Sequence, residues 1–73
     1  MRYEDFKEDV LEGIKKYPRN WRKGQSVFNY IDETYGVARF VQFKDNVDCF
    51  YNDDNIENFM RKSFEAFLDR NTI

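Results

Sequence analysis

The hydrophobic residues of the N-terminal segment recur at helical spacing. Apolar side chains follow one another at steps of three or four positions, at Tyr3, Phe6, Val10, Ile14 and Tyr17. This spacing predicts an amphipathic helix from Tyr3 to Tyr17 whose apolar stripe faces a core. Pro18 ends the predicted helix, because its ring removes a backbone donor and disfavours the helical conformation at the preceding residue.

A second helix is predicted to begin between Asn20 and Gly24. Asn20 is a candidate cap, since a short polar side chain can accept a hydrogen bond from a free N–H of the first turn. The apolar stripe then continues at helical spacing through Val27, Phe28, Ile31 and Tyr35. Gly36 follows, and glycine suits the left-handed conformation that commonly ends a helix.

The C-terminal segment has the clearest helical pattern, with apolar residues at Ile56, Phe59, Met60, Phe64, Phe67 and Leu68. Asp53 or Asp54 is predicted to cap this helix. Glu57 stands three residues after Asp54, which is an acidic version of a capping box.

Val37 to Phe43 is rich in β-branched and aromatic residues, but its apolar positions do not alternate as in a strand. Val37, Phe40 and Val41 fit one face of a helix better, and a lone strand would have no partner. We therefore expect a short helix. The sequence as a whole predicts an all-α single domain, residues 1–73, in which three main helices and one short helix form a small bundle.

The length of 73 residues allows one domain. Folded chains of this size bury only roughly 60% of the surface that the unfolded chain exposes. Eight Phe, five Tyr and one Trp are present, and each ring can bury on the order of 150–250 Å². We expect aromatic packing to supply much of the core.

The chain has a single cysteine, Cys49, and no histidine. One thiol can neither form an internal disulfide nor complete a tetrahedral zinc shell. A nucleophilic Cys49 would lack its usual histidine base, and the acids of Asp45 to Glu57 do not follow the order of an EF-hand. We expect no metal, no cofactor and no enzymatic activity, and we interpret Cys49 as a small buried hydrophobe.

No apolar stretch approaches the roughly 20 residues that cross a bilayer, and the N-terminus has no signal-type apolar run. We therefore predict a cytoplasmic protein that does not contact membranes and is a monomer or a weak homodimer.

Charges are sorted along the chain although the net charge is only −2: Lys15 to Lys23 holds five bases and no acid, and Asp45 to Glu57 holds five acids and no base. A basic run with interleaved aromatics is typical of surfaces that bind single-stranded nucleic acid. We favour a structural role for these charges at helix ends, because an acidic chain is a poor general binder of phosphate backbones.

Arg22, Gln25 and Asn29 share one face of the predicted second helix, and Gly24 beside them allows another backbone to come close. A guanidinium suits a carboxylate, and amides can both donate to and accept from peptide groups. This face is either a ligand pocket or a clamp. We favour the clamp, because a long connection needs internal fastening. The predicted structural clamp comprises Arg22, Gln25, Asn29, Asp48 and Asp53.

The turn after the first helix combines aromatic and basic residues, at Tyr17, Arg19, Trp21 and Lys23. Trp, Tyr and Arg are enriched among the residues that dominate binding energy at protein interfaces. The sequence leaves open whether Trp21 is exposed or closes one end of the core. We predict that these four residues form a partner-binding surface, which we call the corner.

Two short motifs, Arg22-x-Gly24-Gln25-x-x-Phe28-Asn29 and Asp48-x-Phe50-Tyr51-x-Asp53, precede the last helix. With that helix they resemble a set of short phage- and prophage-type proteins of unknown function, over the middle and last thirds of the chain. The resemblance implies a small helical accessory protein of a mobile element and no particular activity. Cys49 departs from this resemblance, because the similar sequences often have proline at the corresponding position.

The leading functional hypothesis is a non-enzymatic accessory protein that binds another protein, as a mobile-element-encoded inhibitor of a host factor. The alternative is a small nucleic-acid-binding module that uses the basic segment Lys15 to Lys23.

Overall fold

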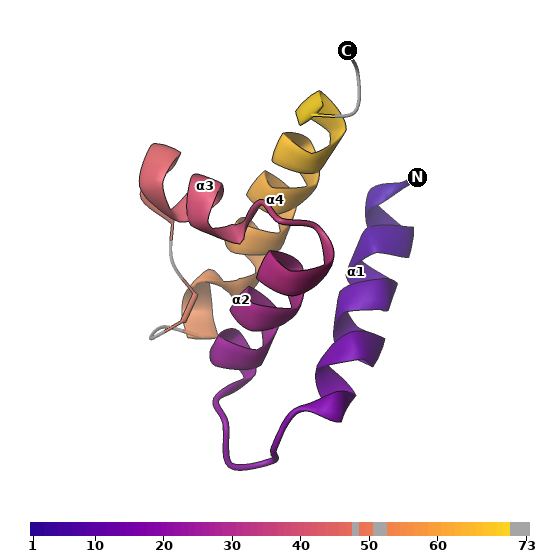
Figure 1. Cartoon of the computed structure of the whole chain (residues 1–73), viewed down its shortest axis with the longest axis vertical. Coiled ribbons are helices and arrows are strands. Elements are labelled where there is room, and N and C mark those ends of the chain that lie inside the picture. The colour runs from indigo at the N-terminus through magenta and orange to yellow at the C-terminus, as the bar shows by residue number, and fades with distance from the viewer. Residues whose placement is uncertain (48, 51–52, 71–73) are drawn as a thin grey trace.

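The computed structural model describes residues 1–47, 49–50 and 53–70, and these residues contain helices and no strands (Figure 1). The elements in chain order are α1 (Tyr3–Gly13), η1 (Ile14–Lys16), α2 (Lys23–Thr34), α3 (Ala38–Lys44), η2 (Asp53–Asn55) and α4 (Ile56–Arg70). The prediction of an all-helical fold is confirmed.

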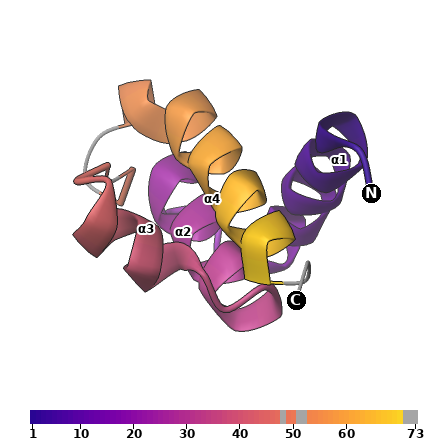
Figure 2. The same ribbon diagram turned by 90° about the horizontal axis from the view of Figure 1, so that it is seen from above.

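α2 and α4 form the centre of the arrangement. Each of them contacts every other α-helix, whereas α1 and α3 lie on opposite sides of α4 (Figure 2). The molecule is elongated, with extents of 39 × 24 × 18 Å. None of the described helices is long and apolar enough to cross a membrane.

α1 is shorter than predicted. Its α-helical part ends at Gly13, and a single 3₁₀ turn, η1, follows. Phe6 and Val10 are fully buried as the stripe requires. Tyr17 has an extended backbone at the end of η1, so it is not a member of the buried stripe. The helix therefore ends several residues before Pro18, which was predicted to terminate it.

α2 begins at Lys23, and the residue in its capping position is Arg22. The prediction that Asn20 caps this helix is wrong, because Asn20 lies in the preceding turn. The inward stripe is confirmed at Val27, Phe28 and Ile31, which are all buried. Gly36 has a φ of 70°, and its N–H donates to the Ile31 carbonyl over 3.0 Å, which confirms the predicted helix end.

α3 is the short helix expected near Val37 to Phe43. Its buried residues are Ala38 and Val41, and Val37 is buried just before it. Phe40 was expected on the inner face, and this prediction is wrong, because half of its surface is exposed. The inner face of α3 is therefore narrow and made of small or β-branched side chains.

α4 follows η2, the 3₁₀ turn that contains Asp53 and Asp54. Phe59 and Met60 of the predicted stripe are buried, and Ser63 and Ala66 are buried with them. Leu68 was predicted to face inward but is 39% exposed. Small residues thus replace large ones along part of the inner face of α4, which allows the neighbouring helices to come close.

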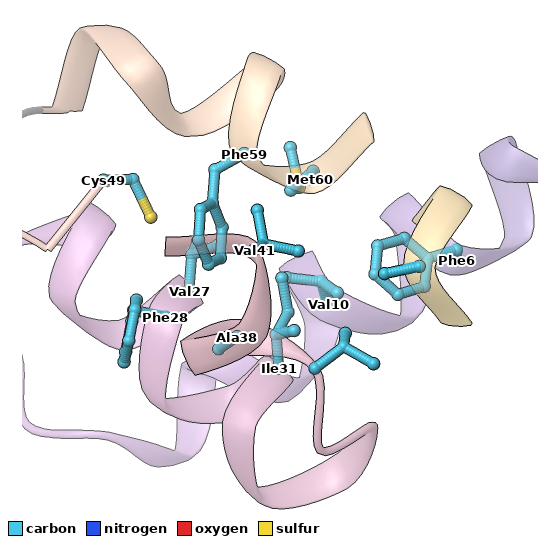
Figure 3. Packing of buried hydrophobic residues seen from close by; sticks show 12 residues of the cluster. Phe6, Val10, Val27, Phe28, Ile31, Ala38, Val41, Cys49, Phe59 and Met60 are labelled. Atoms are coloured by element: carbon cyan, nitrogen blue, oxygen red, sulfur yellow. The ribbon is translucent and has the colours of Figure 1, made fainter. Parts of the chain in front are cut away.

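The core lies between the helices and combines aromatic with aliphatic side chains (Figure 3). Phe28 and Phe59 stack with ring centres 5.4 Å apart, and Phe6 packs against Tyr35 at 4.7 Å and Phe64 at 5.4 Å. Cys49 is fully buried as a member of this core, as predicted. The expected aromatic packing is present, with β-branched side chains from α1, α2 and α3 between the rings.

Candidate functional site

The corner lies at the turn between η1 and α2, at the bottom of Figure 1. The Tyr17 and Trp21 rings stack there with centres 5.1 Å apart and planes 15° from parallel. The backbone N–H of Trp21 donates to the Pro18 carbonyl over 3.1 Å, which closes the turn and brings the two rings onto one side. Both residues are half-buried, and neither belongs to the hydrophobic core.

Glu33 of α2 fixes the tyrosine of this stack. The Tyr17 hydroxyl donates to the Glu33 carboxylate over 3.0 Å, and Lys16 Nζ lies 3.6 Å from the same oxygen. Partial burial and this hydrogen bond raise the pKa of Tyr17 to about 12. Tyr17 is therefore a neutral donor at any physiological pH, and its hydrogen bond to Glu33 holds its ring in place.

The four residues of the corner line one pocket of about 450 Å³, together with Ile14, Lys15, Pro18 and Ser26. The structure thus brings Tyr17, Arg19, Trp21 and Lys23 together from the loop after η1 and the start of α2. A concave surface with an aromatic wall and a cationic rim can hold an apolar side chain and an anionic group at once.

Part of the positive charge near the corner is already neutralised. Lys15 Nζ lies 2.7 Å from the Glu12 carboxylate, and Lys16 is paired with Glu33. Arg19 and Lys23 are exposed. Because exposed ion pairs such as Lys15–Glu12 contribute little to stability, a partner's carboxylate can displace Glu12 at small cost.

A close contact joins the start of α2 to the segment before α4. The Gly24 N–H donates to the Asp53 carboxylate over 3.0 Å, and the Cys49 thiol donates to the Gly24 carbonyl over 3.3 Å. Gly24 is buried, and a Cβ built on it would lie 1.9 Å from the Cys49 carbonyl oxygen. Only glycine leaves room for this approach. The sequence analysis predicted that another backbone would come close at Gly24, and this is confirmed.

Three of the other residues of the predicted clamp, Arg22, Gln25 and Asn29, are in the described part of the chain. Arg22 is exposed before the first turn of α2. Asn29 donates from its side-chain amide to the Gln25 carbonyl one turn earlier, over 2.9 Å, and Gln25 is half-buried. Asp48 lies outside the described residues. The clamping role of Arg22, Gln25, Asn29 and Asp48 stays a prediction.

Two carboxylates that join helices were missed by the sequence analysis. Asp9 of α1 accepts hydrogen bonds from the hydroxyls of Tyr30, over 2.9 Å, and Tyr35. Glu57 of α4 accepts from the Tyr3 hydroxyl over 2.9 Å and from Lys7 over 3.3 Å. One sequence signal could have indicated such pairs. It is a tyrosine at the edge of the apolar stripe of one helix, combined with an acidic residue at the edge of the apolar stripe of another helix.

Glu57 should make stability depend on pH in the acid range. The Tyr3 hydrogen bond, with Lys7 and Arg61 nearby, lowers the pKa of Glu57 below its ordinary 4.5. A lowered pKa in the folded state adds stability that is present above the ordinary value and is lost as the pH falls through the lowered one. We expect Glu57→Gln to be less stable than wild type at neutral pH.

This difference should shrink toward zero well below pH 4.5, the ordinary pKa of Glu57, where Glu57 of the wild type is protonated and therefore neutral like the glutamine. Urea unfolding at a series of pH values measures it. Glu65→Gln removes an exposed carboxylate of the same helix and is the matched control. A constant difference between Glu57→Gln and wild type at every pH would contradict the prediction.

Comparison with known proteins identifies no relative. No protein-family model matches the chain, and neither a curated protein nor a solved structure shows significant similarity to it. Within the described part of the chain, no three Cys, Asp or Glu side chains come together as a metal would require.

Proposed function

We propose that this chain is a non-enzymatic protein that binds another protein through the corner. The observation that supports this most is the pocket in which the Tyr17–Trp21 stack adjoins Arg19 and Lys23. Rings that are already stacked lose little conformational freedom on binding, so more of the contact energy is available for affinity. The resemblance to phage-type proteins extends the proposal to a host protein as the partner.

A slightly larger pocket, of about 530 Å³, lies at the opposite end of α2 and includes Tyr35, Phe67 and Arg70 in its lining. Its two rings pack against each other with centres 5.0 Å apart and border the core. The Arg70 guanidinium donates to the Gly36 carbonyl over 2.8 Å. Its side chains are engaged in holding the fold, so the corner is the better candidate.

The alternative function is nucleic-acid binding by Lys15 to Lys23, which also combines stacked rings with cations. Two of its bases, Lys15 and Lys16, are paired with acids of the chain. With a net charge of −2, the whole molecule is repelled by a phosphate backbone. These charges favour a protein partner.

Replacing Trp21 with alanine should abolish partner capture and leave the fold intact. Losing an interface residue of this kind commonly costs about 2 kcal/mol or more of binding free energy, which is roughly thirtyfold in affinity. Because Trp21 is outside the core, stability should fall by no more than about 1 kcal/mol, the value of a partly exposed ring pair. The measurement is capture from a lysate of the native host, followed by titration with the purified partner.

Two matched variants sharpen the result. Trp21→Phe keeps a ring that can stack on Tyr17 and should retain most of the affinity. Arg19→Glu combined with Lys23→Glu reverses the rim charge and should abolish capture. If Trp21→Ala captures the partner as well as wild type, or unfolds the protein, the corner is not the binding site. Salt-sensitive binding of single-stranded RNA or DNA that needs Trp21 would instead support the alternative.

A further inference from the structure

The outer face of α3 exposes two phenylalanines. Phe43 is 92% exposed and Phe40 is 50% exposed. The helix is attached to the core by its opposite face, where Ala38 and Val41 are buried. Since residues three apart in a helix are neighbours on its surface, Phe40 and Phe43 form one apolar patch. Neither ring is needed to bury the inner face of α3.

Two cations flank this patch. Lys44 Nζ lies 5.3 Å from the centre of the Phe40 ring. Arg39 has an 82% exposed side chain and reaches Asp32 at 3.6 Å. The outer face of α3 thus presents two rings between a lysine and an arginine. α3 lies on the side of α4 away from α1, as Figure 2 shows, and it is separated in the chain from the corner by the whole of α2.

An exposed aromatic patch has a cost in water, because apolar surface is left hydrated. Single exposed hydrophobic residues are common, but adjacent rings with a charged rim are typical of interaction sites. The occupant has to cover two rings and to place its own charges beside Lys44 and beside Arg39, whose exposed pair with Asp32 is weak. Apolar side chains combined with carboxylates meet both requirements, because a partner's carboxylate can share Arg39 with Asp32.

We propose that the outer face of α3 is a second docking surface, and that its occupant is an acidic amphipathic helix of a protein partner. Such a helix presents apolar side chains at steps of three and four to Phe40 and Phe43, and it places glutamates or aspartates beside Arg39 and Lys44. Charge complementarity sets its orientation on α3.

The same charges disfavour the other possible occupants. A second copy of this chain, placed by two-fold symmetry, would bring Arg39 and Lys44 against the same cations. An anionic membrane or a nucleic acid would meet a molecule whose net charge is −2. A short acidic helix meets chiefly the charges close to the patch, where the Arg39 side chain is 82% exposed and the Asp32 side chain that pairs with it only 30%.

The proposal does not depend on the corner. It can fail while Trp21 proves to bind a partner, and it can hold if Trp21 does not. The two surfaces differ in their aromatic residues and lie on different elements, so single substitutions distinguish them.

The test uses a fluorescent synthetic helical peptide as the probe, with leucines at positions i, i+3, i+4 and i+7 and glutamates at its remaining exposed positions. A matched peptide has glutamine in place of every glutamate. Binding is measured by anisotropy and located by the amide shifts of ¹⁵N-labelled protein. Wild type should bind the acidic peptide with saturation, and the shifts should centre on α3. The glutamine peptide should bind several-fold more weakly.

Phe43→Ala should weaken binding about tenfold or more, which is the behaviour of a central aromatic anchor. It should melt like wild type, because Phe43 is 92% exposed. Lys44→Glu should also weaken binding, whereas Lys62→Glu makes the same charge change on α4 and should not. Trp21→Ala should leave binding of this peptide unchanged.

Several results would overturn the proposal. Absence of saturable binding, equal binding of the two peptides, or full affinity in Phe43→Ala would each exclude an acidic helix as the occupant. Vesicles of phosphatidylserine that bind the protein only when Phe43 is present would assign the face to membranes. A dimer in sedimentation equilibrium that is lost in Phe43→Ala would assign it to a second copy.

Discussion

Replacing Gly24 with alanine is expected to destabilise the protein by about 3 kcal/mol or more, which is a large part of the stability of a small domain. The added methyl group would lie 1.9 Å from the Cys49 carbonyl oxygen and 2.8 Å from the Asp53 carboxylate. The first neighbour is backbone, so it cannot move aside by changing a rotamer. Either the start of α2 or the segment around Cys49 has to shift.

Such a shift would also break the hydrogen bonds that Gly24 makes. Its N–H donates to Asp53 and its carbonyl accepts from the Cys49 thiol. Overpacking alone typically costs roughly 1–3 kcal/mol, and each lost hydrogen bond adds roughly 0.5–1.5 kcal/mol. Because Cys49 is fully buried, its displacement would open the core as well. The three effects act in the same direction.

Gly36→Ala is the matched control, measured by urea unfolding beside wild type and Gly24→Ala. Gly36 has a φ of +70° but open space around it, with Arg70 as the nearest neighbour at 3.7 Å. Its substitution should cost only the backbone strain of about 1–2 kcal/mol. If Gly24→Ala proved as stable as Gly36→Ala or more so, the close approach of α2 to the Cys49 segment would not be a structural requirement.

Gly24 also shows what the sequence could predict. Helical spacing predicted the elements because the core imposes one periodicity on every helix packed against it. The left-handed position of Gly36 and the close approach at Gly24 followed from the chemistry of glycine alone. These properties are local, or depend on a residue type with few alternatives.

The predictions that were wrong concern features that the spacing of apolar residues does not determine. Tyr17 and Phe40 are apolar residues at nearly suitable spacing, yet Tyr17 leaves the helix and Phe40 turns outward. Helical spacing specifies the inner face only within about one residue. Val37 and Val41 face inward together with either Ala38 or Phe40, and the distance between α3 and α4 decides which of the two fits. That distance depends on tertiary packing, which the spacing of apolar residues does not specify.

At the candidate site, too, the local features were predictable from the sequence and the tertiary contacts were not. The sequence placed Tyr17, Arg19, Trp21 and Lys23 in one turn, so their proximity was predictable. The carboxylate of Glu33, which orients Tyr17, lies 16 residues further on and could not be assigned to it. The exposed patch on α3 was missed because a phenylalanine is expected to be buried in the absence of a structure.

Phe6 and Phe43 therefore form an instructive pair, because the same substitution should have opposite consequences at the two positions. Phe6 is fully buried, and its ring centre lies 4.7 Å from that of Tyr35, 5.4 Å from that of Phe64 and 6.5 Å from that of Tyr3. These contacts join α1 to α2 and α4. Phe6→Ala should cost about 3–5 kcal/mol, the usual loss for a buried aromatic residue.

A chain of 73 residues has a total stability of roughly 4–11 kcal/mol on the general scale of about 0.05–0.15 kcal/mol per residue. The loss of about 3–5 kcal/mol expected for Phe6→Ala is a large part of this total, whereas Phe43→Ala should change the free energy of unfolding by no more than about 0.5 kcal/mol. Thermal unfolding followed by circular dichroism compares the two variants directly. If Phe43→Ala destabilised as much as Phe6→Ala, the outer face of α3 would be part of the core in solution, and Phe43 would serve packing rather than docking.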